Sequence, residues 1–188
     1  MTQVSRPRFS ARDLSLITTF SVLATLLVAV ASPTLMVATG GVIPLPVWAS
    51  FIWPIAGVFL RALVNRPLTN TFSGVIEGAV GSFVIPIGVF GLLALPLQGL
   101  VLDIVFASRK FRATNPAAGA AAGAPAAALF VFLVVYVFFQ VRSPFPLVAV
   151  LAGAVAGALS GAAGSLMARR VGRMGLLPAP VLESAVQR

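Results

Sequence analysis

Long apolar runs constrain this sequence most, because each is close to the length that crosses a lipid bilayer. A hydrocarbon core of roughly 30 Å requires about 20 residues of helix. Only 9% of the 188 residues are charged, whereas roughly a quarter are charged in soluble domains. We therefore expect an all-α integral membrane bundle of about six transmembrane helices. The predicted spans are residues 13–32, 46–61, 68–85, 88–108, 117–140 and 146–168.

The segments outside these spans define the expected domain organisation. Residues 1–12 form a polar N-terminal segment without a suitably placed cleavage site, so we expect the first run to be a retained helix. The transmembrane domain is predicted over residues 13–173, and a flexible C-terminal tail over 174–188. The stretch 34–45 is expected to be a loop or re-entrant cap, with an extension of the second helix as the alternative. Prolines inside spans predict kinks, and these are Pro54 and Pro96.

Basic residues lie in the breaks between the apolar runs, and nearly all fall on one side of a six-span arrangement. That side carries Arg6, Arg8, Arg12, Arg61, Arg66, Arg109, Lys110, Arg112, Arg169, Arg170, Arg173 and Arg188. Only Arg142 falls on the other side. Under the positive-inside rule, both termini are predicted to be cytoplasmic, with the chain in the plasma membrane. The formal charge of +9 is then a topology signal, and no nucleic-acid partner is expected.

Small residues recur at every fourth position in two of the runs, a spacing that lets membrane helices approach closely. In the last run one row is Ala149, Gly153, Gly157, Gly161 and Ser165, and the adjacent row is Ala152, Ala156, Ser160, Gly164 and Ala168. Packing within this bundle is the favoured interpretation there. In the first run the row is Ser21, Thr25 and Ala29, and a docking surface for a partner subunit is almost as well supported as internal packing.

Two acidic residues, Glu77 and Asp103, lie within predicted spans. A charged side chain in a membrane is costly, so it normally faces the bundle interior and has a partner or a function. Glu77 is near mid-depth, about ten residues or ~15 Å from the start of its span. Asp103 is closer to the basic end, where we favour a structural ion pair with Arg61 or Arg109. Their different depths also argue against an intramembrane enzyme that uses the two acids as a pair.

Five residues are candidates to line one cavity open to the outside. They are Trp53, Glu77, Gln98, Tyr136 and Gln140. Together they offer aromatic faces, one carboxylate and two amides, which suit a planar, nitrogen-rich or cationic solute. The alternative is that these side chains only bridge helices.

The sequence lacks the residues and motifs that several kinds of metal binding and catalysis require. It has no cysteine and no histidine, so we expect neither a transition-metal site nor a cofactor. It also has no phosphate-binding loop of the G-x-x-x-x-G-K-[ST] type and no recognisable hydrolase or metalloprotease motif. The chain is therefore not expected to be an enzyme or to hydrolyse ATP.

Three stretches resemble the substrate-binding S components of energy-coupling factor (ECF) transporters, and most closely the YkoE-like group associated with thiamine or its hydroxymethylpyrimidine precursor. The stretches read WPIAGVFLRALVNRP from Trp53, VIEGAVGS from Val75 and PLQGLVLDIVFA from Pro96. The residues that fall on that group's motif positions are Trp53, Arg66, Pro67, Glu77, Gln98, Gly99 and, at its acidic position, Asp103. Three positions depart from it: Asp103 replaces a glutamate, Leu68 a glycine, and Gly74 a frequent second glutamate.

The resemblance implies a vitamin importer in which this chain captures the solute from outside. It implies a transmembrane coupling (T) subunit and two cytoplasmic ATPases as partners, with the Ser21–Thr25–Ala29 row similar to a docking surface of other S components. Nickel and cobalt members need a histidine near the N-terminus, and none is present. Two alternatives stay open, namely an S component for another vitamin and a membrane scaffold without a ligand.

Overall fold

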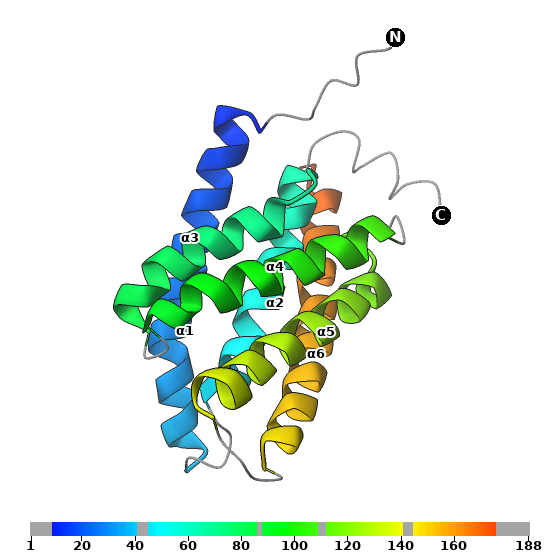
Figure 1. Ribbon diagram of the computed structural model, residues 1–188. Helices are drawn as coiled ribbons and strands as arrows, with labels where there is room; N and C mark the ends of the chain where they lie inside the picture. The colour runs from blue at the N-terminus through cyan, green and yellow to red at the C-terminus, as the bar shows by residue number, and fades with distance from the viewer. Residues whose placement is uncertain (1–8, 41–44, 86–87, 109–111, 141–144, 176–188) are drawn as a thin grey trace.

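The computed structural model describes residues 9–40, 45–85, 88–108, 112–140 and 145–175, and within these ranges the chain is all-helical (Figure 1). The six helices are α1 (Ala11–Ala38), α2 (Leu45–Val64), α3 (Thr69–Val84), α4 (Gly91–Ser108), α5 (Pro116–Phe132) and α6 (Phe145–Arg173). A 3₁₀ turn (Gly88–Phe90) precedes α4, and a π-helical segment (Leu133–Phe138) extends α5. The all-α prediction is confirmed. The predicted tail beyond residue 175, and Arg6, Arg8, Arg109, Lys110 and Arg142, lie outside the described residues.

Five of the helical segments in the described ranges are long and apolar enough to cross a membrane. The third helix differs, because α3 has 16 residues and so extends about 24 Å at 1.5 Å per residue. It is shorter than the roughly 30 Å hydrocarbon core. Its predicted span, 68–85, agrees with the observed helix to within a residue at each end.

Successive helices alternate in direction, so that α1 begins and α6 ends at the same side of the bundle, at the top of Figure 1. The described arginines all belong to that end, at the starts of α1 and α5, the ends of α2 and α6, or the links beside them. They are Arg12, Arg61, Arg66, Arg112, Arg169, Arg170 and Arg173. This arrangement is the one that the charge pattern predicts. The cytoplasmic location of this end remains a prediction.

The first helix is longer than its predicted span. It continues through Pro33 to Ala38, so the prediction of a loop or an extension of the second helix is wrong for residues 34–38. Its start is sharply defined by a capping box, in which Ser10 Oγ accepts from the Asp13 amide at 3.1 Å and Asp13 Oδ2 accepts from the Ser10 amide at 2.9 Å. These two bonds satisfy amides that lack partners within the helix.

The two small-residue rows of α6 pack against two different helices of this chain. A Cβ added to Gly157 or Gly161 would collide with the backbone of Gly123 or Gly119 on α5. On the neighbouring face, a Cβ on Gly164 would lie 2.7 Å from the Ile55 carbonyl oxygen of α2. Internal packing of the last span, the favoured interpretation, is therefore confirmed.

The small-residue row of α1 is also turned inward, which corrects the expectation of a docking surface. Ser21 and Thr25 are 1% and 0% exposed, and Ser21 Oγ lies 2.7 Å from Ser73 Oγ on α3. Ala29 is half-buried against the same core. Both hydroxyls also donate to carbonyl oxygens one turn earlier in α1, Ser21 Oγ to Ile17 at 2.7 Å and Thr25 Oγ1 to Ser21 at 2.9 Å. The exposed face of α1 carries large apolar residues instead, namely Leu23, Leu26, Leu27 and Val30.

Glycines bring α3 and α4 into direct backbone contact. A Cβ on Gly78 would lie 2.6 Å from the Gly91 carbonyl oxygen, and Cβ atoms on Gly74 and Gly99 would collide with the backbones of Leu95 and Asn70. The two helices run side by side in Figure 1. Gly74, where the resembling group often has a glutamate, has no space for one in this packing. This close crossing places the polar residues of α3 opposite those of α4.

Candidate functional site

A buried cavity lies between α2, α3 and α4. Its lining contains three of the predicted ligand-binding residues, Trp53, Glu77 and Gln98, one from each helix. The full lining is Trp53, Gly57, Asn70, Ser73, Glu77, Leu95, Gln98, Gly99 and Leu102. The tertiary structure therefore assembles an aromatic ring, a carboxylate and an amide at one place.

The other two predicted ligand-binding residues lie elsewhere. Tyr136 is in the π-helical segment, where its ring packs against Phe132 with centroids 5.2 Å apart. Gln140 is exposed just beyond that segment, with a positive φ of 50°. Neither residue lines the cavity. The expectation of one cavity formed by all five residues is thus wrong. The π-helical segment does approach the start of α4, where Phe138 stacks on Phe90 with centroids 4.3 Å apart, but Tyr136 and Gln140 are not part of the cavity lining.

The cavity is closed, which corrects the expectation that it opens to the outside. Trp53, Glu77 and Gln98 are 3%, 6% and 3% exposed. The cavity has a volume of about 10 Å³, which is close to what a single water molecule needs. A larger solute can bind only if the surrounding helices separate.

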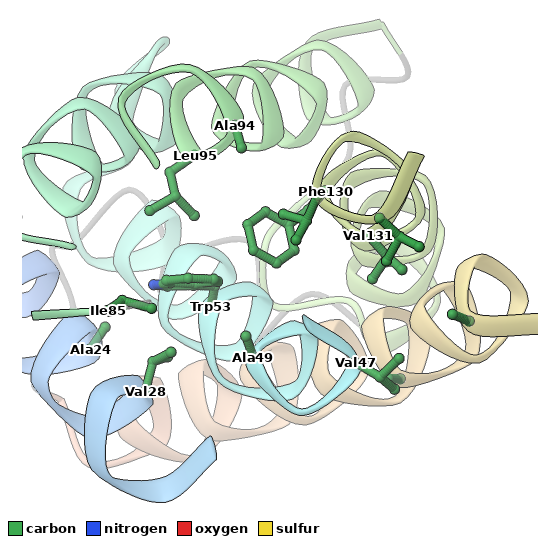
Figure 2. Packing of buried hydrophobic residues seen from close by; sticks show 14 residues of the cluster. Ala24, Val28, Val47, Ala49, Trp53, Ile85, Ala94, Leu95, Phe130 and Val131 are labelled. Carbon is green, nitrogen blue, oxygen red and sulfur yellow. The ribbon is translucent and has the colours of Figure 1, made fainter. Parts of the chain in front are cut away.

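An apolar layer surrounds the indole of Trp53. Phe130 meets it edge to face with centroids 4.9 Å apart. Figure 2 shows Leu95, Ile85 and Phe130 around the ring, and they come from α4, the end of α3 and α5 respectively. This layer places a flat aromatic surface at the boundary between the apolar core and the polar cavity.

A chain of hydroxyls connects Glu77 to α1. Ser73 Oγ donates to Glu77 Oε1 at 2.9 Å, and Ser21 Oγ lies 2.7 Å from Ser73 Oγ. The Ser73 hydroxyl has one hydrogen and donates it to Glu77, so its oxygen is the acceptor that remains for Ser21, whose own hydroxyl is also 2.7 Å from the Ile17 carbonyl oxygen of α1. One oxygen of the buried carboxylate is thereby held in place, and α1 is tied to the wall of the cavity.

Three polar atoms of the lining have no hydrogen-bond partner among the residues that the structure describes. They are Trp53 Nε1, Asn70 Oδ1 and Gln98 Nε2, all buried. Leaving a buried polar group unsatisfied costs about 1–3 kcal/mol, so such groups gather where a bound molecule completes their hydrogen bonds. The first and third atoms are donors and the second is an acceptor.

Asp103 lies next to the cavity but does not line it. Its Oδ1 accepts from Asn70 Nδ2 at 3.1 Å, and its Oδ2 accepts from the Thr71 amide at 2.8 Å and from Thr71 Oγ1 at 2.9 Å. Arg61 Nη1 is 3.9 Å from Oδ1. The predicted structural ion pair is therefore confirmed for Arg61, although the shorter contacts are those at the start of α3.

Sequence reasoning missed Asn70 and Ser73, although a signal was present. They precede Glu77 by seven and four residues, and this spacing places all three on one face of a helix. A polar face in an otherwise apolar run could have identified them. Within the described residues, no group of three or more acidic side chains is clustered tightly enough to hold a metal ion.

Comparison with known proteins shows which family this sequence matches. Residues 12–130, well over half of the chain, match the family described as "ABC-type cobalt transport system, permease component". The chain belongs to this family. No curated protein matches this permease sequence.

The fold of the permease also matches a solved structure, described as "Crystal structure of an S-component of ECF transporter". The TM-score is 0.72 and the sequence identity is 16%, with 90% of this chain and 88% of the other covered. At this identity the likeness concerns the fold alone. The α2–α4 region that forms the cavity lies entirely within the matched residues 12–130.

Proposed function

We propose that this permease component is the substrate-binding S component of an ECF importer in the plasma membrane, and that it captures thiamine or its hydroxymethylpyrimidine precursor. The observation that carries the proposal is the buried cavity with three unpartnered polar atoms beside an ionisable carboxylate. In this proposal Trp53 stacks on the ring of the solute. Glu77 accepts hydrogen bonds from it or faces a cationic ring, and Gln98 donates to it.

Cobalt is the second candidate, because the description of the family names it. The donors that line the cavity are one carboxylate, two amides, a hydroxyl and an indole. Imidazole and thiolate are the ligands that suit cobalt and its neighbours best, and the sequence contains neither histidine nor cysteine. The donor set and the adjacent indole favour an organic ring over a bare metal ion.

Transport in this proposal requires partners, since the chain has no ATP-binding motif. We expect a transmembrane T subunit and two cytoplasmic ATPases to associate with it, and both termini to be cytoplasmic. Because Ser21 and Thr25 are buried, the T subunit would meet the exposed apolar face of α1 that carries Leu23, Leu26, Leu27 and Val30.

The test is thermal stabilisation of the detergent-purified chain by thiamine, hydroxymethylpyrimidine, biotin, riboflavin or Co²⁺. A ligand that binds only the folded state at 100 times its Kd stabilises it by about 2.7 kcal/mol. We expect a shift with thiamine or hydroxymethylpyrimidine. A shift with Co²⁺ alone would replace the vitamin by the metal, and no shift with any of them would favour a scaffold without a ligand.

The Glu77→Gln variant tests whether the ligand binds in this cavity. It keeps the volume of the side chain but removes the charge, so affinity should fall at least tenfold while the protein stays folded. The matched control is Gln140→Ala, which changes a polar residue that was expected to bind ligand but lies outside the cavity. Unchanged affinity in Glu77→Gln would contradict the placement of the site.

A further inference from the structure

We propose that Asn70 is the specificity-determining acceptor of the cavity, held in one orientation by Asp103, and that it selects ligands with an amino group over analogues with a carbonyl at the same position. This inference rests on the proposed function, since it assigns a role to one wall of the same cavity. Asn70 is 2% exposed and lies at the floor of the cavity, beside Gly57 and Gly99.

The orientation of the Asn70 amide follows from its partner. An amide can present either its oxygen or its NH₂ to a neighbour, but the group next to it is the carboxylate of Asp103, 3.1 Å from Nδ2. Asp103 also accepts from the amide and hydroxyl of Thr71 and lies near the Arg61 guanidinium. Surrounded by donors, it acts as an acceptor, so Asn70 must give it the NH₂.

The amide oxygen is consequently turned away from Asp103. Asn70 Oδ1 is buried without a partner, and a Cβ added to Gly57 would lie 3.0 Å from it. The absence of a side chain at Gly57 leaves this oxygen its space on the α2 side. If the Asn70 amide rotated, its oxygen would face the Asp103 carboxylate, and the hydrogen bond between Nδ2 and Oδ1 would be lost. The acceptor is therefore fixed before any ligand enters.

The fixed oxygen determines which ligand edge fits. An amino group on a planar ring supplies the N–H that Asn70 Oδ1 lacks, while a ring nitrogen or oxygen can accept from Gln98 Nε2. A carbonyl in place of the amino group would oppose two oxygens in a buried site. A site that is built to hydrogen-bond one group of its ligand strongly rejects an analogue without that group. We expect the cavity to prefer the amino form by roughly 10- to 100-fold.

The experiment compares thiamine with oxythiamine, in which a carbonyl replaces the pyrimidine amino group. Binding to the purified full chain is measured by calorimetry for wild type and for Asn70→Leu, Asp103→Asn and Thr71→Val. Asn70→Leu removes the acceptor. Asp103→Asn lets the Asn70 amide rotate, because the new side chain can donate to its oxygen. Thr71→Val is the matched control, since it removes a different hydrogen bond to Asp103.

The expected result is a wild-type preference for thiamine that falls towards unity in Asn70→Leu and Asp103→Asn but persists in Thr71→Val. A preference that is unchanged in folded Asn70→Leu or Asp103→Asn overturns the inference while the proposed function stands. Equal binding of the two compounds by wild type overturns it without any variant. If wild type binds neither compound, the proposed ligand is wrong and the inference is wrong with it.

Discussion

The contact between Gly99 and the start of α3 offers a sharp test of how the cavity is built. In a Gly99→Ala variant, the new Cβ would meet the carbonyl oxygen of Asn70, its carbonyl carbon at 2.5 Å and the Thr71 amide nitrogen at 2.9 Å. All three are backbone atoms, so no flexible side chain can yield. The helices must separate by about 1.4 Å to bring the closest of these contacts, with the carbonyl oxygen, to a normal distance of roughly 3.5 Å.

The expected cost follows from this overlap. Forcing extra volume into a packed interior costs about 1–3 kcal/mol, and each kcal/mol lowers the Tm of a chain of this size by roughly 2–4 °C. We therefore expect the Tm of Gly99→Ala to fall by roughly 2–12 °C. Because Gly99 also lines the cavity and adjoins Asn70, ligand affinity should fall at least tenfold.

Two controls separate crowding from the substitution itself. Gly81→Ala is also a glycine in a helix, but its Cβ would lie 3.3 Å from the end of Ile85 and 3.7 Å from a Thr25 methyl group, so stability should change by less than about 1 kcal/mol. Gly123→Ala collides with the Gly157 backbone on α6. It should lower the Tm as Gly99→Ala does, without changing ligand affinity.

The measurements are thermal unfolding, followed by tryptophan fluorescence in detergent, and ligand titration. A Gly99→Ala variant as stable and as active in binding as wild type would refute the reasoning, because the α3–α4 contact would then be looser than the structure shows. Loss of affinity in Gly123→Ala would show that binding follows overall stability and not the cavity wall.

Two further predictions concern residues away from the cavity. Replacing Tyr136 by alanine should leave ligand affinity within about twofold of wild type in a titration, because its ring packs on Phe132 outside the cavity. A larger loss of affinity would show that Tyr136 belongs to the binding site. Replacing Ser10 by alanine should lower the free energy of unfolding by about 1 kcal/mol, since it removes half of the capping box. An unchanged unfolding curve would show that this cap contributes nothing to stability.

The lengths of the apolar runs predicted the helices well, because the bilayer imposes helix length and requires every backbone group to be hydrogen-bonded. The α6 rows of small residues correctly indicated close packing, and the depth of Asp103 correctly indicated a structural partner in Arg61. The end of α1 was predicted less well. The first span was predicted to end at residue 32, but the helix continues through Pro33 to Ala38, as membrane helices tolerate internal proline when neighbours compensate.

The binding site was only partly predictable. Trp53, Glu77 and Gln98 were identified as costly polar or aromatic groups in apolar runs, and they do meet. Tyr136 and Gln140 were grouped with them because they are polar residues near the outer end of their span that share one helix face at i and i+4. Rotation about each helix axis and the crossing of α3 on α4 decide which residues share a cavity, and these depend on contacts between distant segments.

The sequence by itself determined that this chain is a helical membrane bundle with its basic residues at one end, because bilayer thickness and the cost of buried charge act on each segment separately. Only the tertiary structure decided that Ser21 and Thr25 face inward, that the cavity is closed, and that Asn70 belongs to it. Each of those outcomes depends on which helix faces another, and glycine contacts such as Gly99 against Asn70 determine that only once the bundle has packed.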